Sequence, residues 1–253
     1  MDVAEFISHH ILDHDWGVML GGWRIPVTTH SVTIFGVSLV LFLVLLYISR
    51  PRTSRSGRLL TTLTESYITF IRDGLVMPNI GAEGRAFVPY FCTLFLFILS
   101  VNLAGMIPQM KTATSNISVT GALALCSGML IVGSGIKYHG VWGFLKGFVP
   151  SGTPGWLVPL LFPLEVISLI IKVCVLAIRL FANMLSGHIA LLCLLLLVFI
   201  IGELSSLAGV GAVLPAMFLE LFVTCLELLV AFLQAYVFTL LTAIFAGNVI
   251  HTH

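Results

Sequence analysis

Ionisable side chains that could do chemistry lie inside long apolar stretches of this sequence. The run AIRLFANMLSGHIA, residues 177–190, places Arg179, Asn183 and His188 among leucine, isoleucine and alanine. An ionised side chain at the centre of a bilayer costs about 2.5 to 3.5 kcal/mol even on lenient insertion scales, and such side chains usually face a cavity, a partner or an ion path. The pattern therefore raises the possibility of ion movement through a membrane.

Two polar stripes run along the last two apolar segments. The first stripe contains Glu165, Lys172, Arg179, Asn183 and Ser186. At 100° per residue of helix these residues fall within about 60° of one another. The second stripe contains Glu220, Thr224, Glu227 and Gln234, which also share a helix face. His188 points to the opposite side of its helix from Arg179.

Such stripes have two explanations. Interhelical hydrogen bonds could simply hold the helices together, at about 1 kcal/mol each. The two stripes would be expensive for that purpose alone, because several of their members are ionisable. An ion path is the favoured interpretation.

The composition is that of an integral membrane protein. Of the 253 residues, 58% are hydrophobic and only 9% are charged, with a mean hydropathy of +1.10, whereas soluble domains carry roughly 25% charged residues. The net charge of +1 creates no basic field that would attract nucleic acid. The five cysteines lack metal or redox spacing. Neither a phosphate-binding glycine loop nor a nucleophile arrangement is visible, so we expect no catalytic site, cofactor or metal.

We predict an all-α membrane fold with five crossing helices, because about 20 apolar residues span a bilayer. The expected spans are 31–49, 86–107, 117–136, 157–201 and 212–250. Residues 61–80 mix apolar side chains with Glu65, Arg72 and Asp73, which favours an amphipathic helix at the membrane interface. We expect residues 1–30 to form an outward-facing segment and residues 31–253 a single membrane domain.

Basic residues predict the orientation. Four arginines lie in 50–58, and Lys137 and Lys146 lie between later spans, so these loops are expected on the inner side. The N-terminus is then outside, and five crossings put the C-terminus inside. We expect a bacterial plasma membrane, with the mitochondrial inner membrane as the alternative.

The fourth apolar region is too long for an upright span. A helix over residues 164–201, which contain no proline and only Gly187 as a glycine, would be about 57 Å long. The hydrocarbon core is only about 30 Å thick. Either the helix is continuous and tilted by about 60° from the membrane normal, or two short upright spans break near Gly187. Three glycines, Gly202, Gly209 and Gly211, are expected to mark the turn to the last region.

Two motifs resemble a known family. The runs RLFANMLSGH, residues 179–188, and LELLVAFLQAYVFTLLTAIF, residues 226–245, resemble the signature helices of the subunit a family of F-type ATP synthases. The resemblance extends through residues 87–120 and 159–184 and covers most of 85–250. It implies that 157–250 is a two-helix proton-channel unit facing a rotating c-ring.

The resemblance also implies roles for single residues. Arg179 would stand as the barrier between two offset half-channels, one open to each side of the membrane. His188 and Glu227 would serve the outer half-channel, with their positions exchanged relative to many bacterial members. Asn183 and Gln234 would order water or hydrogen-bond the arginine.

Other residues are expected at the two ends of the proton path. Glu165 would serve the inner half-channel, and Lys172 either belongs to the path or holds Glu165 in a structural ion pair. Apart from the family motifs, Glu220 and Glu203 lie toward the outer end of the last two regions, and we expect them to line the outer mouth. Ser115 stands where many members have an acid.

The implied partners are the c-ring, b-type peripheral stalk subunits, the F1 ATPase sector and the lipid bilayer. ATP chemistry would take place on other subunits. A stand-alone ion-coupled transporter is the alternative, although no repeat relates the two halves of the sequence. A membrane scaffold without transport is disfavoured because buried polar stripes are costly.

Overall fold

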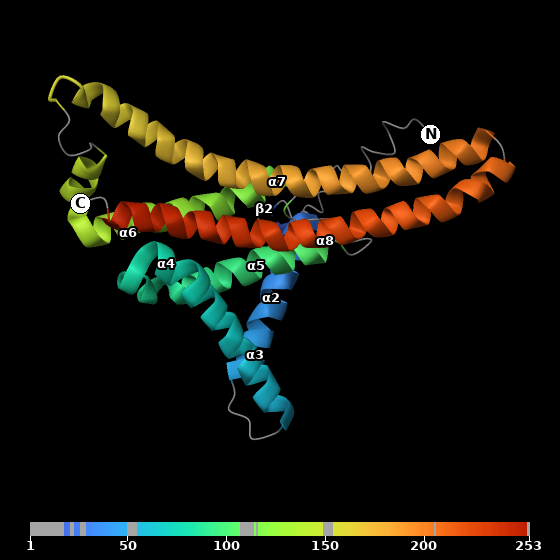
Figure 1. The fold of residues 1–253 in the computed structure, drawn as a ribbon, viewed down its shortest axis with the longest axis horizontal. Coiled ribbons are helices and arrows are strands. Elements are labelled where there is room, and N and C mark those ends of the chain that lie inside the picture. The colour runs from blue at the N-terminus through green and yellow to red at the C-terminus, as the bar shows by residue number, and fades with distance from the viewer. Residues whose placement is uncertain are drawn as a thin grey trace.

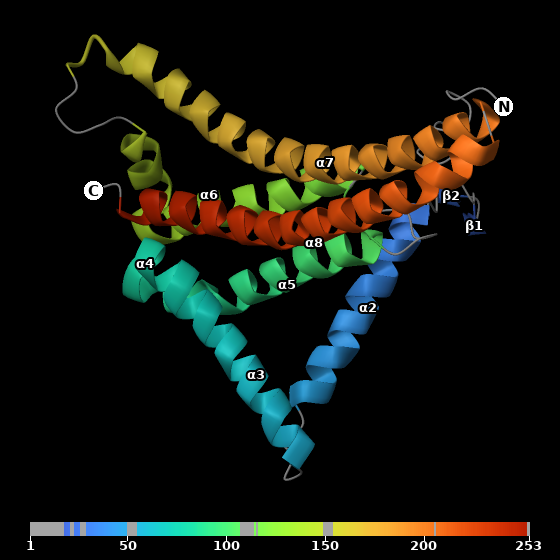
Figure 2. The same ribbon diagram turned by 45° about the vertical axis from the view of Figure 1, so that its right-hand side comes forward.

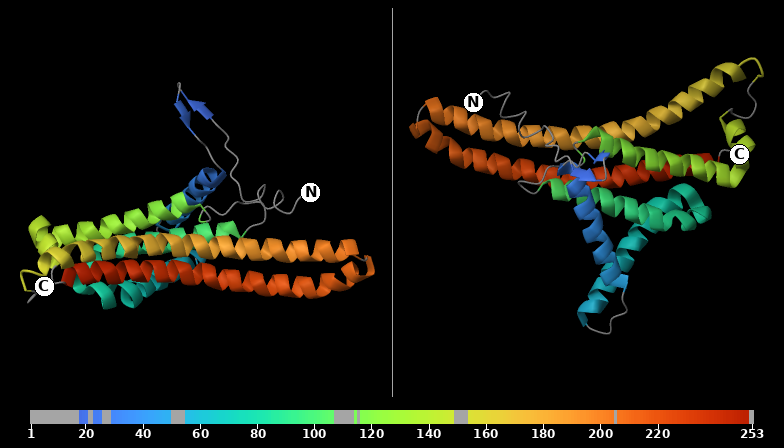
Figure 3. Two further views of the ribbon diagram at one scale, coloured as in Figure 1. Left: turned by 90° about the horizontal axis from the view of Figure 1, so that it is seen from above. Right: turned by 180° about the vertical axis from the view of Figure 1, so that it is seen from behind.

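The computed structural model describes residues 18–20, 23–25, 29–49, 55–106, 114, 116–148, 154–204 and 206–251. Two long helices, α7 and α8, lie side by side along the length of the molecule (Figure 1). The helices α5 and α6 pack against this pair, and α2 and α3 project away from it to form a V (Figure 2). Figure 3 shows from above and from behind that α6 runs beside α7 and α8. The predicted all-α membrane fold is confirmed.

The two long helices are uninterrupted. The first, α7, spans Val158–Leu204, and the second, α8, spans Ser206–His251. The alternative of two short spans broken near Gly187 is therefore wrong. A single glycine costs a helix only about 1 kcal/mol relative to alanine, and packing along a neighbouring helix compensates for that.

The helix α7 ends at Leu204, and α8 begins at Ser206. The glycines predicted to mark this turn, Gly202, Gly209 and Gly211, instead belong to the two helices. Glycine permits a turn but does not require one. The prediction that these three glycines mark the turn is therefore wrong.

The helix α6, Ile117–Gly147, continues beyond its predicted end at residue 136. It begins at Asn116, whose side-chain Oδ1 accepts a hydrogen bond from the Ser118 N–H at 2.9 Å, a typical helix cap. It bends at Gly140, where φ is 69° and ψ is 171°. Only glycine adopts this left-handed conformation without strain, so the sequence permits the bend at this residue.

The preceding part of the chain is one run of helical segments. The helix α2 spans Thr29–Ser49. After residues 50–54, the segments are α3 (Arg55–Ile71), a π-helical turn (Arg72–Val76), α4 (Met77–Ile80), a 3-10 helix (Gly81–Phe87) and α5 (Val88–Gly105). Residues 61–80 are thus helical as predicted. Their location at the membrane interface stays a prediction.

Four stretches are long and apolar enough to cross a membrane, and a fifth is shorter. The four are Leu59–Gly105, Ile117–Gly147, Val158–Leu194 and Val213–His251, and the shorter stretch is Ser31–Tyr47. Their lengths and compositions match a multi-pass membrane protein.

A small β-hairpin precedes α2. Strand β1, Val18–Leu20, pairs antiparallel with β2, Trp23–Ile25, in the register Val18↔Ile25 and Leu20↔Trp23. The sequence analysis did not predict it, although Gly21-Gly22 between two short apolar runs is a hairpin signal. Most of the N-terminal segment 1–30, predicted to face outward, lies outside the described residues.

Small side chains allow α8 to pack closely against its neighbours. The alanines 231, 235, 243 and 246 are completely buried. A Cβ built on Gly247 would overlap the backbone oxygen of Asn79 in α4. Small residues at helix contacts let backbones approach in this way.

Two histidines fix the C-terminal end of α8. Nε2 of His251 donates to the carbonyl of Ile80, the last residue of α4, at 2.9 Å. Nε2 of His139, in α6, donates to the Ile250 carbonyl at 2.8 Å. The end of α8 is thereby tied to both α4 and α6.

Candidate functional site

Arg179 lies near the middle of α7 and is half-buried. Its neighbours Leu176 and Leu180 are buried against the other helices. Among the residues that the structure describes, no carboxylate comes within ion-pair distance of its guanidinium. The positive charge is therefore not neutralised by the described part of its own chain.

Glu227, in α8, packs directly on the backbone of Gly187 in α7. A Cβ built on Gly187 would lie 3.1 Å from Cδ and 3.3 Å from Cγ of Glu227, and closer still to Oε1. The missing side chain of Gly187 thus makes the space that the half-buried carboxylate occupies. The structure brings Glu227 to the turn of α7 that also contains His188.

The other predicted site residues of the two polar stripes lie on α7 and α8. Asn183 is half-buried one turn beyond Arg179, and its carbonyl accepts a hydrogen bond from the Ser186 hydroxyl at 3.0 Å. Gln234 is half-buried in α8. Glu220 is exposed, and its carbonyl accepts a hydrogen bond from the Thr224 hydroxyl at 2.8 Å.

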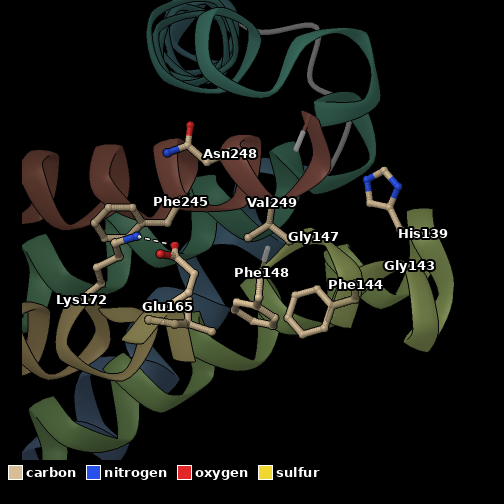
Figure 4. A pocket seen from close by; sticks show the side chains of 11 residues that line it. His139, Gly143, Phe144, Gly147, Phe148, Glu165, Lys172, Phe245, Asn248 and Val249 are labelled. Atoms are coloured by element: carbon tan, nitrogen blue, oxygen red, sulfur yellow. Dashed lines mark ion pairs between the residues drawn. The ribbon is translucent and has the colours of Figure 1, made fainter. Parts of the chain in front are cut away.

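Glu165 and Lys172 form an ion pair (Figure 4). They lie seven residues apart on the same face of α7. Lys172 Nζ lies 3.9 Å from Glu165 Oε1 and 5.6 Å from the ring centre of Phe245 in α8. The lysine is therefore held by an acid of its own helix and by an aromatic ring of the neighbouring one.

Two predicted residues are placed only by their backbones. His188 and Glu203 both lie in α7, and their side chains, like Ser115, are outside the described part of the structure. Within the described residues, no group of three histidine, cysteine, aspartate or glutamate side chains could hold a metal ion.

Asn102, in α5, was missed by the sequence analysis. It is completely buried, and its Nδ2 donates to the Ala231 carbonyl of α8 at 3.3 Å. Its Oδ1 has no hydrogen-bond partner among the described residues, which leaves a buried acceptor that a water could satisfy. Ala231 is one turn from Glu227 and one turn from Gln234. The only sequence signal was a lone asparagine in the apolar run LSVNLAG, residues 99–105.

Known proteins match nearly the whole chain. A family model described as ATP synthase A chain matches residues 31–247. ATP synthase subunit a of Myxococcus xanthus is 41% identical over 91% of this chain and 75% of its own length. The subunit a of Granulibacter bethesdensis is 38% identical over 99% of this chain and 96% of its own. That of Acidiphilium cryptum is 42% identical over 81% of this chain and 80% of its own. The chain therefore belongs to the ATP synthase A chain family.

Proposed function

We propose that this chain is the stationary proton-translocating subunit of a rotary ATP synthase. Its two long helices would face a ring of c subunits, each with one carboxylate in the membrane. Protons would reach that carboxylate through one half-channel and leave through the other. Membership of the family and the two polar stripes on adjacent apolar helices support this function.

The observation that carries the proposal is the state of Arg179. A guanidinium stays protonated in proteins, so it attracts an ionised carboxylate but does not relay a proton. Because no carboxylate of the described chain neutralises it, its charge is available to a carboxylate from another subunit. Arg179 would then separate the two half-channels.

The outer half-channel would use the contact between α7 and α8 around Gly187. Glu227 and His188 would exchange protons there, since histidine titrates near neutral pH. Asn183 and Gln234 would order the intervening water, and Glu220 would lie toward the outer mouth.

The inner half-channel would involve Glu165. This residue lies 14 positions before Arg179, which corresponds to about 21 Å of helix. Lys172 would act as the ion-pair partner of Glu165.

Purification tests the assignment. A tagged chain isolated in mild detergent should bring with it a c-ring, b-type stalk subunits and the F1 ATPase sector, and an untagged chain should recover none of them. Recovery of the tagged chain alone, as an active transporter in liposomes, would contradict the proposal. That outcome would support the stand-alone transporter instead.

A further inference from the structure

Tryptophans and lysines lie near the end of the molecule where α6 ends, α7 begins and α8 ends (Figure 2). Trp142, beyond the bend of α6, is 80% exposed, and Trp156, in the turn before α7, is 79% exposed. Lys137 and Lys146 are exposed on α6. Tryptophan is enriched at membrane–water interfaces, and lysine on the inner side of membranes. With the predicted orientation, we therefore expect these residues at the inner surface of the membrane.

The Lys137 ammonium group lies against two aromatic rings. Its Nζ is 5.6 Å from the ring centre of Phe87 and 5.8 Å from that of Tyr138. Phe87 ends the 3-10 helix before α5, and the Tyr138 hydroxyl donates to the Glu83 carbonyl of the same 3-10 helix at 3.4 Å. The two rings thus join α6 to the 3-10 helix. Cation–π contacts of this kind position the ammonium group without neutralising its charge.

A second cation lies on the 3-10 helix. Arg85 is exposed, two residues before Phe87. No carboxylate of the described residues comes within ion-pair distance of Arg85 or Lys137. Glu83, the acid of this 3-10 helix, is two residues from Arg85, and side chains of a 3-10 helix align every three residues. The two positive charges are therefore available to an anion.

An apolar strip on α6 leads from Lys137 toward the middle of the membrane. Its members are Leu125, Met129 and Ile136, which are 60%, 72% and 39% exposed. Their spacings of four and seven residues put them on one face of the helix. The strip ends one residue before Lys137, so apolar surface and positive charge are adjacent. A molecule with an anionic head and apolar chains would match both.

We propose that Lys137 and Arg85 bind the phosphate of an anionic phospholipid from the inner leaflet, whose acyl chains lie along the apolar strip of α6. Arginine binds phosphate oxygens in a bidentate manner, and lysine acts as a point charge. Basic pockets between membrane helices on the inner side bind such headgroups. A soluble phosphate ion would meet the same cations but would not use the apolar strip. This inference does not depend on the proposed function.

Photocrosslinking to lipid tests the site. The assembled complex is reconstituted in phosphatidylcholine vesicles that contain a minor fraction of phosphatidylglycerol with a diazirine in its acyl chain. After illumination, mass spectrometry of peptides measures the labelled fraction of residues 125–136. Phosphatidylglycerol should label this stretch roughly fivefold or more above phosphatidylcholine that carries the same diazirine, because the cations favour the anionic headgroup. Equal labelling by the two lipids would overturn the proposal.

Substitutions of the two cations locate the headgroup. Lys137→Gln and Arg85→Gln should each lower phosphatidylglycerol labelling by roughly fivefold, the usual effect of one basic residue at an anionic membrane surface. Lys137→Arg should retain the labelling. Arg72→Gln is the matched control, because it also removes one positive charge, but from a residue that already pairs with Asp73. Wild-type labelling in assembled Lys137→Gln complexes would contradict the assignment.

Inorganic phosphate distinguishes a lipid headgroup from a soluble anion. The labelling is repeated with an excess of phosphate and with chloride at the same ionic strength. Labelling that is equal in the two salts supports the lipid site. Labelling that is lost in phosphate but kept in chloride would mean that the cations bind a soluble anion, and the lipid assignment would be wrong.

Discussion

At the scale of single residues, the contact between Gly187 and Glu227 is the most specific feature of the site. The sequence suggested that His188 and Glu227 form a titratable pair on two different helices. The structure adds that the residue next to His188 must be small, because the Glu227 carboxylate occupies the place of a side chain there. The site therefore depends on a glycine at position 187 as well as on the polar side chains around it.

We predict that Gly187→Val displaces Glu227 and lowers ATP-driven proton pumping by roughly tenfold or more, since misplacing a reacting group by about 1 Å can reduce a rate 10²-fold. The complex should still assemble, because Glu227 can rotate toward the exposed side of α8. Quenching of a pH-sensitive dye in inside-out vesicles measures the pumping rate.

Gly133→Ala is the matched control for this substitution. Gly133 lies in α6, and a Cβ built there meets no atom within 4 Å. Pumping by Gly133→Ala should equal that of wild type. Equal pumping by Gly187→Val and Gly133→Ala would show that the Glu227 position does not matter.

The role of Lys172 was left open by the sequence, as either part of the path or the ion-pair partner of Glu165. The structure contains the pair at 3.9 Å. Partly exposed pairs of this kind contribute only about 0 to 1 kcal/mol to stability. The pair is therefore not a major support of the fold, which is consistent with a place beside water.

At the scale of elements, a close backbone contact and a histidine hydrogen bond hold the end of α8 against α4. Gly247 touches the backbone of Asn79 in α4, and His251 bonds to the next residue, Ile80. These contacts fix the end of α8 against the segment that precedes α5.

We predict that Gly247→Val destabilises the assembled protein by about 1 to 3 kcal/mol, the usual cost of overpacking a tight contact. The thermal transition of the purified complex, followed by light scattering or dye binding, should shift to lower temperature. Gly121→Ala, where a Cβ meets nothing within 4 Å, should leave the transition within about 0.5 kcal/mol of wild type. An unchanged transition in Gly247→Val would mean that α4 and α8 can separate easily.

The extents of the long helices were predictable from the sequence, but the details of their ends were not. Apolar length and the scarcity of proline indicated α7 and α8 well. The bend of α6 was not predicted, because the stretch 133–147 contains several glycines and the sequence does not indicate that Gly140 is the one with a positive φ. The β-hairpin was missed because its strands are only three residues long.

The site was predictable to a similar degree. Helical periodicity placed Glu165 beside Lys172, which the ion pair confirms. The contact between Gly187 and Glu227 depends on how α7 and α8 slide along each other, and the sequence placed the turn between them only approximately. Asn102 was missed because nothing in the sequence reveals which face of α5 meets α8.

At the scale of the whole molecule, the orientation of the chain in the membrane would determine the side to which each proposed half-channel opens. Five apolar stretches cross the membrane if Ser31–Tyr47 spans it together with the four longer ones. The termini then lie on opposite sides. The basic residues near α3 predict that the N-terminus lies outside.

We predict that a short tag on the C-terminus is cleaved by added protease in inside-out vesicles and protected in right-side-out cells. A tag on the N-terminus should show the reverse. Quantitative immunoblots of both preparations measure the two cleaved fractions. Cleavage of both tags on the same side would mean an even number of crossings.

The central claim is that Arg179 is the charged barrier between two half-channels. The most direct measurement is ATP-driven proton pumping by the Arg179→Ala complex in inside-out vesicles. Arg72→Ala is the control, because Arg72 pairs with Asp73 on the exposed π-helical turn and lies on neither polar stripe. The account predicts that Arg179→Ala assembles fully but does not pump, while Arg72→Ala pumps normally. Pumping by assembled Arg179→Ala complexes at the wild-type rate would contradict it.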